Sequence, residues 1–323
     1  MKKMSKLLAI VLCFALALTM CACGNSDEGG SVPAELIFGT GGDTGTYYAF
    51  GGVLAQYISS NTDVSVTHVT SNGSQANIED IDGGVIQLGF VQSDVMSYAY
   101  SGTNLFEAPI NSFSVIAAMY MEQVQIVTLD PEIKTVADLE GKTVSIGAQG
   151  SGVYFNALDV LGAYGLTEED IDPVYQSFGD SVESLQDGKI DAAFIVAGAP
   201  TNAVTSLAAT NNVYVVSLDS EHIASLIETS PYYSESTIAA DVYGTPEDVT
   251  TVAIAAVIIV DNDVPEDTVY SITSAIFENL DAISEQHAKG LECSVEFAAS
   301  ITDVPYHPGA AKYFAEKGID VTT

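Results

Sequence analysis

The stretch LIFGTGGDTGTYYAFGGVLAQYI (36–58) predicts a short strand, a glycine-rich turn and a helix, in that order. A second stretch, TVSIGAQGSGVYFNALDVLGAYGL (143–166), has the same succession of features. An offset of 107 residues aligns Gly45 with Gly152, Tyr47 with Tyr154, and Val53-Leu54 with Val160-Leu161. We interpret the two stretches as copies of one structural unit.

A second pair of segments extends this repeat. SQANIEDIDGGVIQLGFVQSD (74–94) matches DSVESLQDGKIDAAFIVAGAP (180–200), which places Phe90 opposite Phe194. In both segments a polar residue precedes a short helix, an Asp-Gly turn ends it, and an apolar strand follows. Strands that alternate with helices indicate parallel sheets with crossover helices. The sequence therefore predicts two similar α/β lobes, although strand–turn–helix units also resemble one another without a true repeat.

Two long apolar segments flank the second copy and predict how the lobes are joined. FSVIAAMYMEQVQIVTL (113–129) precedes this copy, and VTTVAIAAVIIVDNDVP (249–265) follows it. Such strands are expected to cross between the lobes as a hinge. Helical segments are expected at 266–287 and 309–317. We predict that lobe one comprises 34–122 and 251–323, and that lobe two comprises 123–250.

The N-terminus has the features of an export signal. Three lysines precede a 14-residue apolar run (7–20), which is too short to span a bilayer. Small residues, cysteines and the sequence GNSDEGGSVP follow, as at the cleavage site and tether of a bacterial lipoprotein. We expect a lipoprotein signal peptide at 1–22 and a tether at 23–33, with Cys23 as the lipidated residue because an alanine precedes it. Cys21, preceded by a methionine, is the second candidate.

This start predicts an extracytoplasmic protein that is lipid-anchored to the outer face of the cell membrane, or periplasmic. The alternative is a cytoplasmic protein with a buried apolar first helix. Cysteine usage agrees with export, because Cys293 is the only cysteine beyond this segment. One thiol forms no internal disulfide and no thiolate metal site, so we expect Cys293 to serve packing.

The charge balance excludes one class of partner. Among 323 residues, 43 are acidic and 9 are basic, for a net charge of −34, and every basic residue is a lysine. The predicted signal peptide holds three of these lysines and no acids, so its removal changes the net charge to −37. Nucleic acids and anionic lipid surfaces are bound by basic faces. The acidic charge therefore argues against nucleic acids and anionic lipid surfaces as partners. A content of 47% hydrophobic residues indicates a globular protein.

The glycine-rich turns predict a binding site for a small solute. In open α/β sheets ligands bind at the carboxyl ends of the strands, and a turn before a helix presents free N–H groups and the positive end of the helix dipole. Uncharged polar and aromatic residues beside these turns suit a small-molecule cleft. The candidate ligand-binding residues are Gly45, Thr46, Tyr47, Tyr48, Ser71, Asn72, Ser74, Gln92, Ser93, Ser151, Gly152, Val153, Tyr154, Ala197 and Gly198. Tyr47 and Tyr154 could equally be core rings, and a tight turn can also exist without a ligand.

Catalytic, nucleotide and metal sites are not indicated. The turns lack a Walker lysine and a full G-x-G-x-x-G, and Ser151 lacks both outer glycines of a nucleophile elbow. His68, His222, His287 and His307 are scattered along the chain. The segment around Asp80 fails the EF-hand pattern. We expect a protein that is not an enzyme and has no cofactor and no metal site.

Six motifs resemble those of one known family. They are GGDTGTYYAFG (41–51), SNGSQANI (71–78), LGFVQSD (88–94), IGAQGSG (146–152), DGKIDAAFIVAGAP (187–200) and VPYHPGAAKYFAEKGI (304–319). Their order over nearly all of 36–319 is similar to that of the TAXI solute receptors, the extracytoplasmic binding proteins of one branch of the TRAP transporters. The resemblance implies a two-lobe periplasmic-binding-protein type II fold that closes on its ligand. It also implies delivery of the ligand to a TRAP-type permease, usually driven by a sodium gradient.

The family's ligand contacts transfer onto specific positions of this chain. They are Gly45, Thr46, Tyr47, Ser71, Ser74, Gln92, Ser93, Ser151, Gly152, Val153, Ala197 and Gly198. The first loop departs from the family pattern, because Asp43 and Thr44 stand where relatives commonly keep glycine and Asn72 replaces another. Relatives bind glutamate, glutamine or 2-oxoacids, but the acidic Asp43 argues against simple dicarboxylate binding. The chain has no arginine, so an anion must be held by N–H groups, hydroxyls, Gln92 or a lysine such as Lys142 or Lys189.

The sequence thus predicts a monomeric receptor for a small organic solute, an amino acid such as glutamate or a small carboxylate, that works with a TRAP-type permease. One alternative is a sensor, or a receptor for another transporter class such as the ABC type. Another is a secreted hydrolase that uses Ser151.

Overall fold

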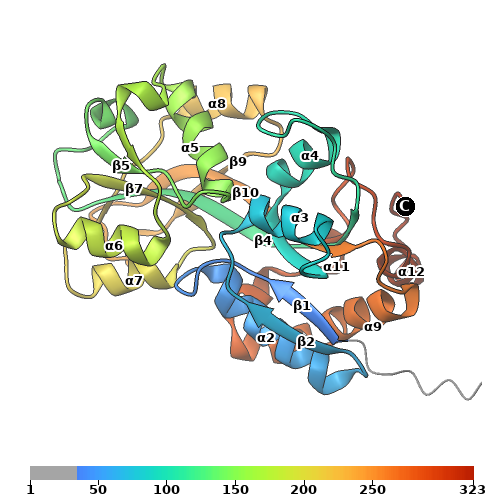
Figure 1. The fold of residues 1–323 in the computed structure, drawn as a ribbon. Helices are drawn as coiled ribbons and strands as arrows, with labels where there is room; N and C mark the ends of the chain where they lie inside the picture. The colour runs from blue at the N-terminus through green and yellow to red at the C-terminus, as the bar shows by residue number, and fades with distance from the viewer. Residues whose placement is uncertain (1–34) are drawn as a thin grey trace, which may run out of the picture. The chain divides into compact units, whose positions relative to one another are not determined.

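The computed structural model describes residues 35–323 (Figure 1). The predicted signal peptide (1–22), the tether (23–33), Cys21 and Cys23 lie outside the described residues. No helix in residues 35–323 is both long enough and apolar enough to cross a membrane.

The first repeat forms three parallel strands with helices between them. In chain order its elements are β1 (Glu35–Gly39), α2 (Thr46–Asn61), β2 (Ser65–Val69), α3 (Ser74–Asp82), β3 (Leu88–Gln92) and α4 (Ser93–Ser101). The strands lie in the order β2-β1-β3, with β1 central. β3 is buried along its whole length, as expected for a parallel strand covered on both faces.

The second repeat has the same succession of elements. They are β5 (Thr143–Ser145), α5 (Gly152–Ala163), β6 (Asp172–Val174), α6 (Phe178–Gln186), β7 (Ala192–Ala197) and α7 (Asn202–Ala208). The first strand of the repeat is again central, in the order β6-β5-β7, and both pairs are parallel. The predicted repeat is therefore confirmed at the level of topology.

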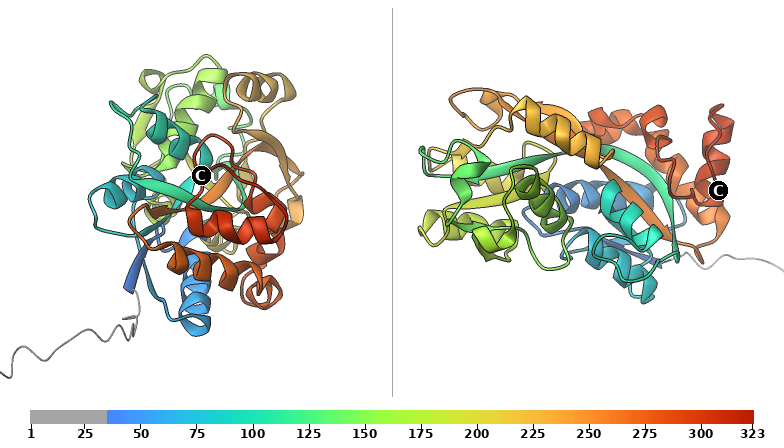
Figure 2. Two further views of the ribbon diagram at one scale, coloured as in Figure 1. Left: turned by 90° about the vertical axis from the view of Figure 1, so that its right-hand side faces the viewer. Right: turned by 90° about the horizontal axis from the view of Figure 1, so that it is seen from above.

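Two long antiparallel strands join the repeats into one mixed sheet. β4 (Phe113–Thr128) and β10 (Val249–Asp261) pair with each other through Phe113–Gln123 and Ala253–Asp261, with two shifts of register. β10 pairs with β3 through Ala256–Val260, whereas β4 pairs with β7 through Gln123–Thr128. The sheet order is β2-β1-β3-β10-β4-β7-β5-β6, and Figure 2 shows β4 and β10 running from one lobe into the other. The predicted pair of crossing strands is confirmed, and it fuses the two parallel sheets that the repeat predicted separately.

Two short strands also belong to this sheet: β8 (Tyr214–Val215) pairs with β4, and β9 (Ser234–Ile238) pairs with β10. The remaining elements are the short helices η1 (Val136–Leu139), η2 (Glu168–Asp170), η3 (Ala240–Val242) and η4 (Ala288–Glu292), and the helices α8 (Ser220–Thr229), α9 (Glu266–Phe277), α10 (Leu280–Gln286), α11 (Val295–Ala298) and α12 (Pro308–Glu316). The helical segments expected near the C-terminus correspond to α9, α10 and α12.

The hydrophobic core is divided at the middle of the long strands. One cluster includes β4 as far as Tyr120 and β10 from Ala256 onward, together with β1–β3, α2–α4 and α9–α12. Two further clusters begin at Val124 of β4, end at Ile254 of β10, and include the buried apolar residues of α5–α8, except Phe155 of α5, which belongs to the first cluster. We refer to the elements around the first cluster as lobe one and those around the other clusters as lobe two. The residue boundaries given above stay a prediction.

Candidate ligand-binding cleft

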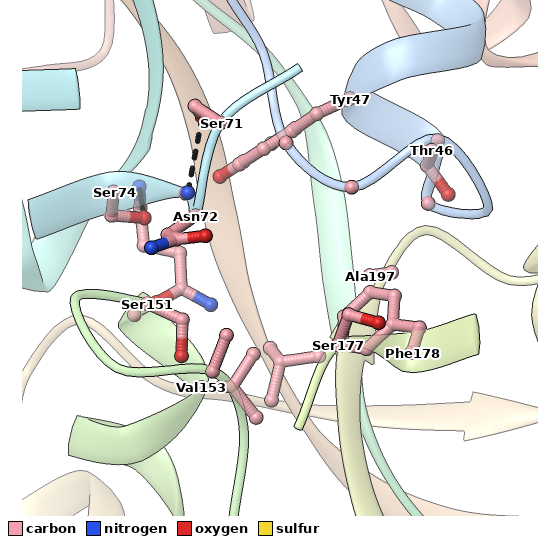
Figure 3. A pocket seen from close by; sticks show the side chains of 18 of the residues that line it. Thr46, Tyr47, Ser71, Asn72, Ser74, Ser151, Val153, Ser177, Phe178 and Ala197 are labelled. Carbon is pink, nitrogen blue, oxygen red and sulfur yellow. Dashed lines mark hydrogen bonds between the residues drawn. The ribbon is translucent and has the colours of Figure 1, made fainter. Parts of the chain in front are cut away.

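A cleft lies between the lobes at the carboxyl ends of their parallel strands. It holds about 600 Å³ of space, part of which is open solvent. Lobe one contributes Gly41, Gly42, Gly45, Thr46, Tyr47, Ser71, Asn72, Gly73, Ser74, Gln92 and Glu122; lobe two contributes Ala148, Ser151, Gly152, Val153, Gln176, Ser177, Phe178, Val196 and Ala197. Figure 3 shows Tyr47, Ser71 and Asn72 facing Ser151 and Val153 across this space.

Three helices begin at the cleft without a side-chain cap. α2, α3 and α5 have Gly45, Gly73 and Ser151 as their N-cap residues, and none of these donates or accepts a side-chain capping bond. Gly73 has a φ of 106°, which a residue with a Cβ rarely adopts. Uncapped first-turn N–H groups and three converging helix dipoles create a positive potential in the cleft without any basic side chain. The arrangement favours a carboxylate or another small anion.

An aromatic ring and a carboxyl group form the part of the cleft nearest the hinge. The Tyr47 ring stacks on Phe90, with centroids 4.7 Å apart and planes 3° apart. Its hydroxyl donates a 2.7 Å hydrogen bond to Oε2 of Glu122 on β4. Glu122 is only 1% exposed. Burial raises the pKa of this carboxyl to about 8, the bond from Tyr47 and the charge of Lys289 lower it, and the charge of Asp94 raises it.

Several polar atoms at the cleft have no hydrogen-bond partner in residues 35–323. They are Oε1 of Gln92, Oγ of Ser151 and Oε1 of Gln176, and all three are buried. Buried polar groups in folded proteins are nearly always paired, because leaving one unpaired costs about 1–3 kcal/mol. Three such oxygens beside one cleft point to a partner that arrives from outside the chain.

Hydrogen bonds cross the cleft and hold the lobes together at its rim. The N–H of Ala76 in α3 donates to Gly150 in lobe two at 3.0 Å, and the N–H of Ala203 in α7 donates to Thr44 in lobe one at 3.1 Å. The Thr46 hydroxyl donates to the carbonyl of Gly198 at 2.9 Å. The lobes are therefore in a closed arrangement around the cleft.

A model of the NMT1-like family matches residues 38–318, which is most of the chain. The chain belongs to the NMT1-like family.

Solved structures share the fold of this NMT1-like protein. A protein of Bordetella bronchiseptica RB50 matches with a TM-score of 0.55 and 16% identity, over 87% of this chain and 89% of that one. A putative L-cystine ABC transporter protein from Listeria monocytogenes has a TM-score of 0.51 and 14% identity, over 80% and 97%. The alkanesulfonate-binding protein SsuA from Xanthomonas axonopodis pv. citri, bound to MOPS, has a TM-score of 0.50 and 14% identity, over 88% and 91%. The chain thus has the predicted α/β fold, that of type II periplasmic binding proteins.

Eleven of the fifteen candidate residues line the cleft of this NMT1-like protein. They are Gly45, Thr46, Tyr47, Ser71, Asn72, Ser74, Gln92, Ser151, Gly152, Val153 and Ala197. Their contact with a ligand stays a prediction. Tyr48, Ser93, Tyr154 and Gly198 lie outside this lining.

Tyr154 lies outside the cleft because the two copies begin their helices at different positions. The extended N-cap residue is Gly45 in α2 but Ser151 in α5, so Tyr47 is the second helical residue and Tyr154 the third. One residue corresponds to about 100° of rotation around a helix. Tyr154 therefore packs against Phe155 and Tyr175, and its hydroxyl donates to Glu168 at 3.0 Å. Val153 is the residue of α5 that corresponds to Tyr47 in space.

Local contacts occupy the other three residues. Tyr48 packs against the ring of His68, with centroids 4.8 Å apart. Ser93 begins α4 and is buried, and its carbonyl accepts a bond from Ser97. Gly198 gives room to a neighbouring side chain, because a Cβ there would lie 2.3 Å from Cε of Lys289.

The lysines proposed from the sequence as anion partners are not part of the lining. Lys189 forms an exposed ion pair with Asp187 at 2.8 Å. Lys142 precedes β5, and its backbone N–H and carbonyl bond to Leu139 and Asp172. Among the described residues that line the cleft, only backbone dipoles therefore attract an anion.

The histidines and the cysteine have structural contacts. His287 and His307 each accept a 3.2 Å bond through Nδ1 from a backbone N–H of the helical segment that follows, and burial lowers the pKa of both. His222 contacts Asp219. Burial raises the pKa of Cys293 to about 12, so its thiol is unreactive at neutral pH. Residues 35–323 contain no group of three or more His, Cys, Asp or Glu residues arranged to hold a metal ion.

Part of the lining lies outside the fifteen candidate residues. These lining residues are Gly41, Gly42, Gly73, Glu122, Ala148, Gln176, Ser177, Phe178 and Val196. Ser177 is the N-cap of α6 and Phe178 is its first residue, as Gly73 and Ser74 are in α3, the counterpart of α6 in the repeat. Comparison of these two helix starts could have found them. Glu122 had no such signal, because it lies inside a long strand.

Proposed function

We propose that this chain is an extracytoplasmic solute-binding receptor that captures a small organic solute between its lobes and delivers it to a membrane permease. The observation that carries the proposal is the closed cleft, in which three uncapped helix starts converge on buried polar atoms without partners. The solute is an amino acid such as glutamate or a small carboxylate. Its carboxylate is held by backbone N–H groups at Thr46, Tyr47, Ser74, Gly152 and Val153. No enzymatic step is part of the proposal.

Closure couples ligand binding to the shape of the receptor. The ligand contacts both lobes only in the closed form, so its binding shifts the population toward closure. The long strands β4 and β10 are the only sheet elements that extend through both halves of the described core, and they supply the hinge. The permease then distinguishes a loaded receptor from an empty one by the closed arrangement.

The type of permease divides the proposal into two versions. The six motifs similar to TAXI receptors favour a TRAP-type permease. The likeness to an alkanesulfonate-binding protein and to a putative L-cystine ABC transporter protein favours an ABC-type partner. We give priority to the TRAP version because its motifs extend in order over nearly the whole folded chain. Reconstitution with each permease in proteoliposomes decides between them, since only the cognate permease will take up solute in a receptor-dependent manner.

The N-terminal sequence supports attachment of the receptor to the outer face of the membrane. In this proposal residues 1–22 are removed and Cys23 carries the lipid. Cys23→Ala should release the protein from the membrane fraction, whereas Cys21→Ala should leave it there. The reverse result would identify Cys21 as the lipidated residue.

A ligand screen tests the receptor proposal directly. The protein beginning at residue 24 should be melted in the presence of each L-amino acid and of small mono- and dicarboxylates. A ligand at about 100 times its Kd adds about 2.7 kcal/mol to the free energy of unfolding, so a true ligand should raise Tm by several degrees. Mass spectrometry of the denatured protein will identify any small molecule that was carried through purification. If no compound raises Tm and none is carried, the proposal is wrong.

A further inference from the structure

The hinge side of the cleft presents one carboxyl group and no cation. Glu122 is the only ionisable acid or base, apart from the Tyr47 hydroxyl, among the described residues that line the cleft. It lies on β4 opposite Ile254 of β10, where the two strands pass between the lobes. Tyr47 bonds to Oε2, and no hydrogen bond within residues 35–323 reaches Oε1. One oxygen of this carboxyl is therefore available to a ligand.

The nearest lysine does not neutralise Glu122 directly. Lys289 on η4 is buried, and its Nζ pairs with Oε1 of Glu292 at 2.5 Å. The same Nζ lies 5.4 Å from the centroid of the Tyr120 ring. The side chain of Lys289 also packs against Gly198, where a Cβ would lie 2.3 Å from its Cε. No salt bridge to Glu122 exists in the described residues. The ionised form of Glu122 therefore has no directly paired counter-ion among residues 35–323.

The buried side-chain atoms without partners in the residues that line this cleft are predominantly acceptors. Gln92, only 2% exposed, leaves Oε1 unpaired, and Oε1 of Gln176 is unpaired on the lobe-two side. The Ser151 hydroxyl is also without a partner. A primary ammonium group offers three donors and no acceptor, and it carries the charge that Glu122 lacks. A keto oxygen at the same place could accept from Glu122 only while this carboxyl is protonated, and it would leave the oxygens of Gln92 and Gln176 without a donor.

We propose that Glu122 selects ligands that carry a primary ammonium group, so that the cleft binds an α-amino acid in preference to the 2-oxo acid with the same carbon skeleton. In this arrangement the ammonium lies at the hinge side against Glu122, and the carboxylate lies at the uncapped starts of α2, α3 and α5. This inference rests on the proposed receptor function and specifies its substrate class.

Protonation of Glu122 gives the interaction a measurable signature. The groups that influence it are Tyr47 on α2, Asp94 on α4, and Lys289 on η4. Because burial raises its pKa to about 8, the carboxyl is mostly protonated at pH 7 in the empty cleft. An arriving ammonium favours the carboxylate form, so the proton leaves to solvent as the ion pair forms.

The experiment compares matched ligands on matched variants. L-amino acids that raise Tm should be titrated by calorimetry at pH 7 beside their 2-oxo acids, for example L-glutamate beside 2-oxoglutarate, in buffers of different ionisation enthalpy. We expect the amino acid to bind at least about tenfold more tightly and to release up to one proton. Glu122→Gln should weaken the amino acid about 100-fold, change the 2-oxo acid by less than about threefold, and abolish proton release. Glu183→Gln, an exposed acid on α6, is the control and should behave as the wild type.

The outcomes separate this inference from the receptor proposal. If no compound raises Tm, the receptor proposal itself is wrong. If a 2-oxo acid or another compound without an amine binds as tightly as the best amino acid, the receptor stands and the ammonium inference is wrong. The same holds if Glu122→Gln weakens both ligands equally. A circular-dichroism melt of Glu122→Gln shows whether such an equal loss comes from misfolding. If it does, Glu122→Asp, which keeps the charge, tests the inference in its place and should retain the preference for the amine.

Discussion

Glu122 and Asp94 are two buried acids, and neither forms an ion pair within residues 35–323. Asp94 is fully buried at the start of α4, and burial raises its pKa to about 7. Glu122 on β4 has a pKa raised to about 8 for the same reason. A carboxyl whose pKa is raised binds a proton in the folded state at a pH where the unfolded chain has released it. Such groups therefore lower the free energy of unfolding as pH rises.

We therefore predict that the ligand-free protein loses stability as pH rises from 6 to 8. In this window both acids are ionised in the unfolded chain and still partly protonated in the folded state. Glu122 alone should account for about 2 kcal/mol of the loss, at about 1.4 kcal/mol per pKa unit. Urea unfolding followed by circular dichroism at pH 6, 7 and 8 measures it. Glu122→Gln should have a shallower dependence than Glu183→Gln, and parallel curves for the two variants would contradict the prediction.

Glu122 could not be predicted from the sequence because its environment is assembled from distant segments. The hydroxyl that bonds to it belongs to Tyr47, and the cation behind it is Lys289. Its own segment is a long apolar strand, in which one acid resembles an exposed residue. Residues on the glycine turns were predictable because each turn carries its own signal, namely a strand before it and a helix after it.

At the scale of elements, α2 and α5 show what a repeat can predict and where it misleads. The shared pattern correctly predicted a strand, a turn and a helix in each lobe. The alignment matched Gly45 with Gly152, but Gly45 is the N-cap of α2 whereas Gly152 is the first residue of α5. The side chain that faces the cleft is therefore Tyr47 in one lobe and Val153 in the other. A helix start depends on turn geometry, which letters alone determine only to within a few residues.

Gly152 permits α5 to approach lobe one, which gives a prediction for this element. A Cβ at Gly152 would lie 1.8 Å from Oε1 of Gln92 and 2.8 Å from Oγ of Ser74, both in lobe one. Gly152→Ala should therefore prevent full closure while leaving each core intact. Overpacking of this kind costs about 1–3 kcal/mol, so ligand affinity should fall about 10- to 100-fold, as measured by calorimetry.

Gly162→Ala is the matched control for this change, since it lies on the same helix and its Cβ would meet nothing within 4 Å. It should bind ligand normally and be slightly more stable, because alanine favours helix. If Gly152→Ala binds as tightly as Gly162→Ala, the approach of α5 to Gln92 is not required for binding.

At the scale of the whole molecule, a buried polar network connects the lobes away from the cleft. Nδ2 of Asn156, on α5, donates to Asp94 of lobe one at 2.9 Å and to the Tyr233 hydroxyl at 2.8 Å. Tyr233 in turn donates to Asp159 at 2.9 Å. A second contact joins the lobes where the Tyr232 hydroxyl donates to Asp303 at 3.1 Å. Opening of the hinge must break these bonds, so they stabilise the closed form.

We predict that Asn156→Ala shifts the receptor toward the open form. The change leaves Asp94 buried without its donor in the closed state, whereas opening exposes this carboxyl to water. Hydrogen bonds to charged groups contribute about 1.5–3 kcal/mol, so affinity should fall about tenfold or more at pH 8. Small-angle scattering should show a larger radius of gyration without ligand, which saturating ligand restores. At pH 5.5, where Asp94 is protonated, the loss should be smaller. Asn61→Ala, an exposed change at the end of α2, should alter neither quantity. A lower Tm with unchanged affinity and radius would show that the network serves the core of lobe two rather than closure.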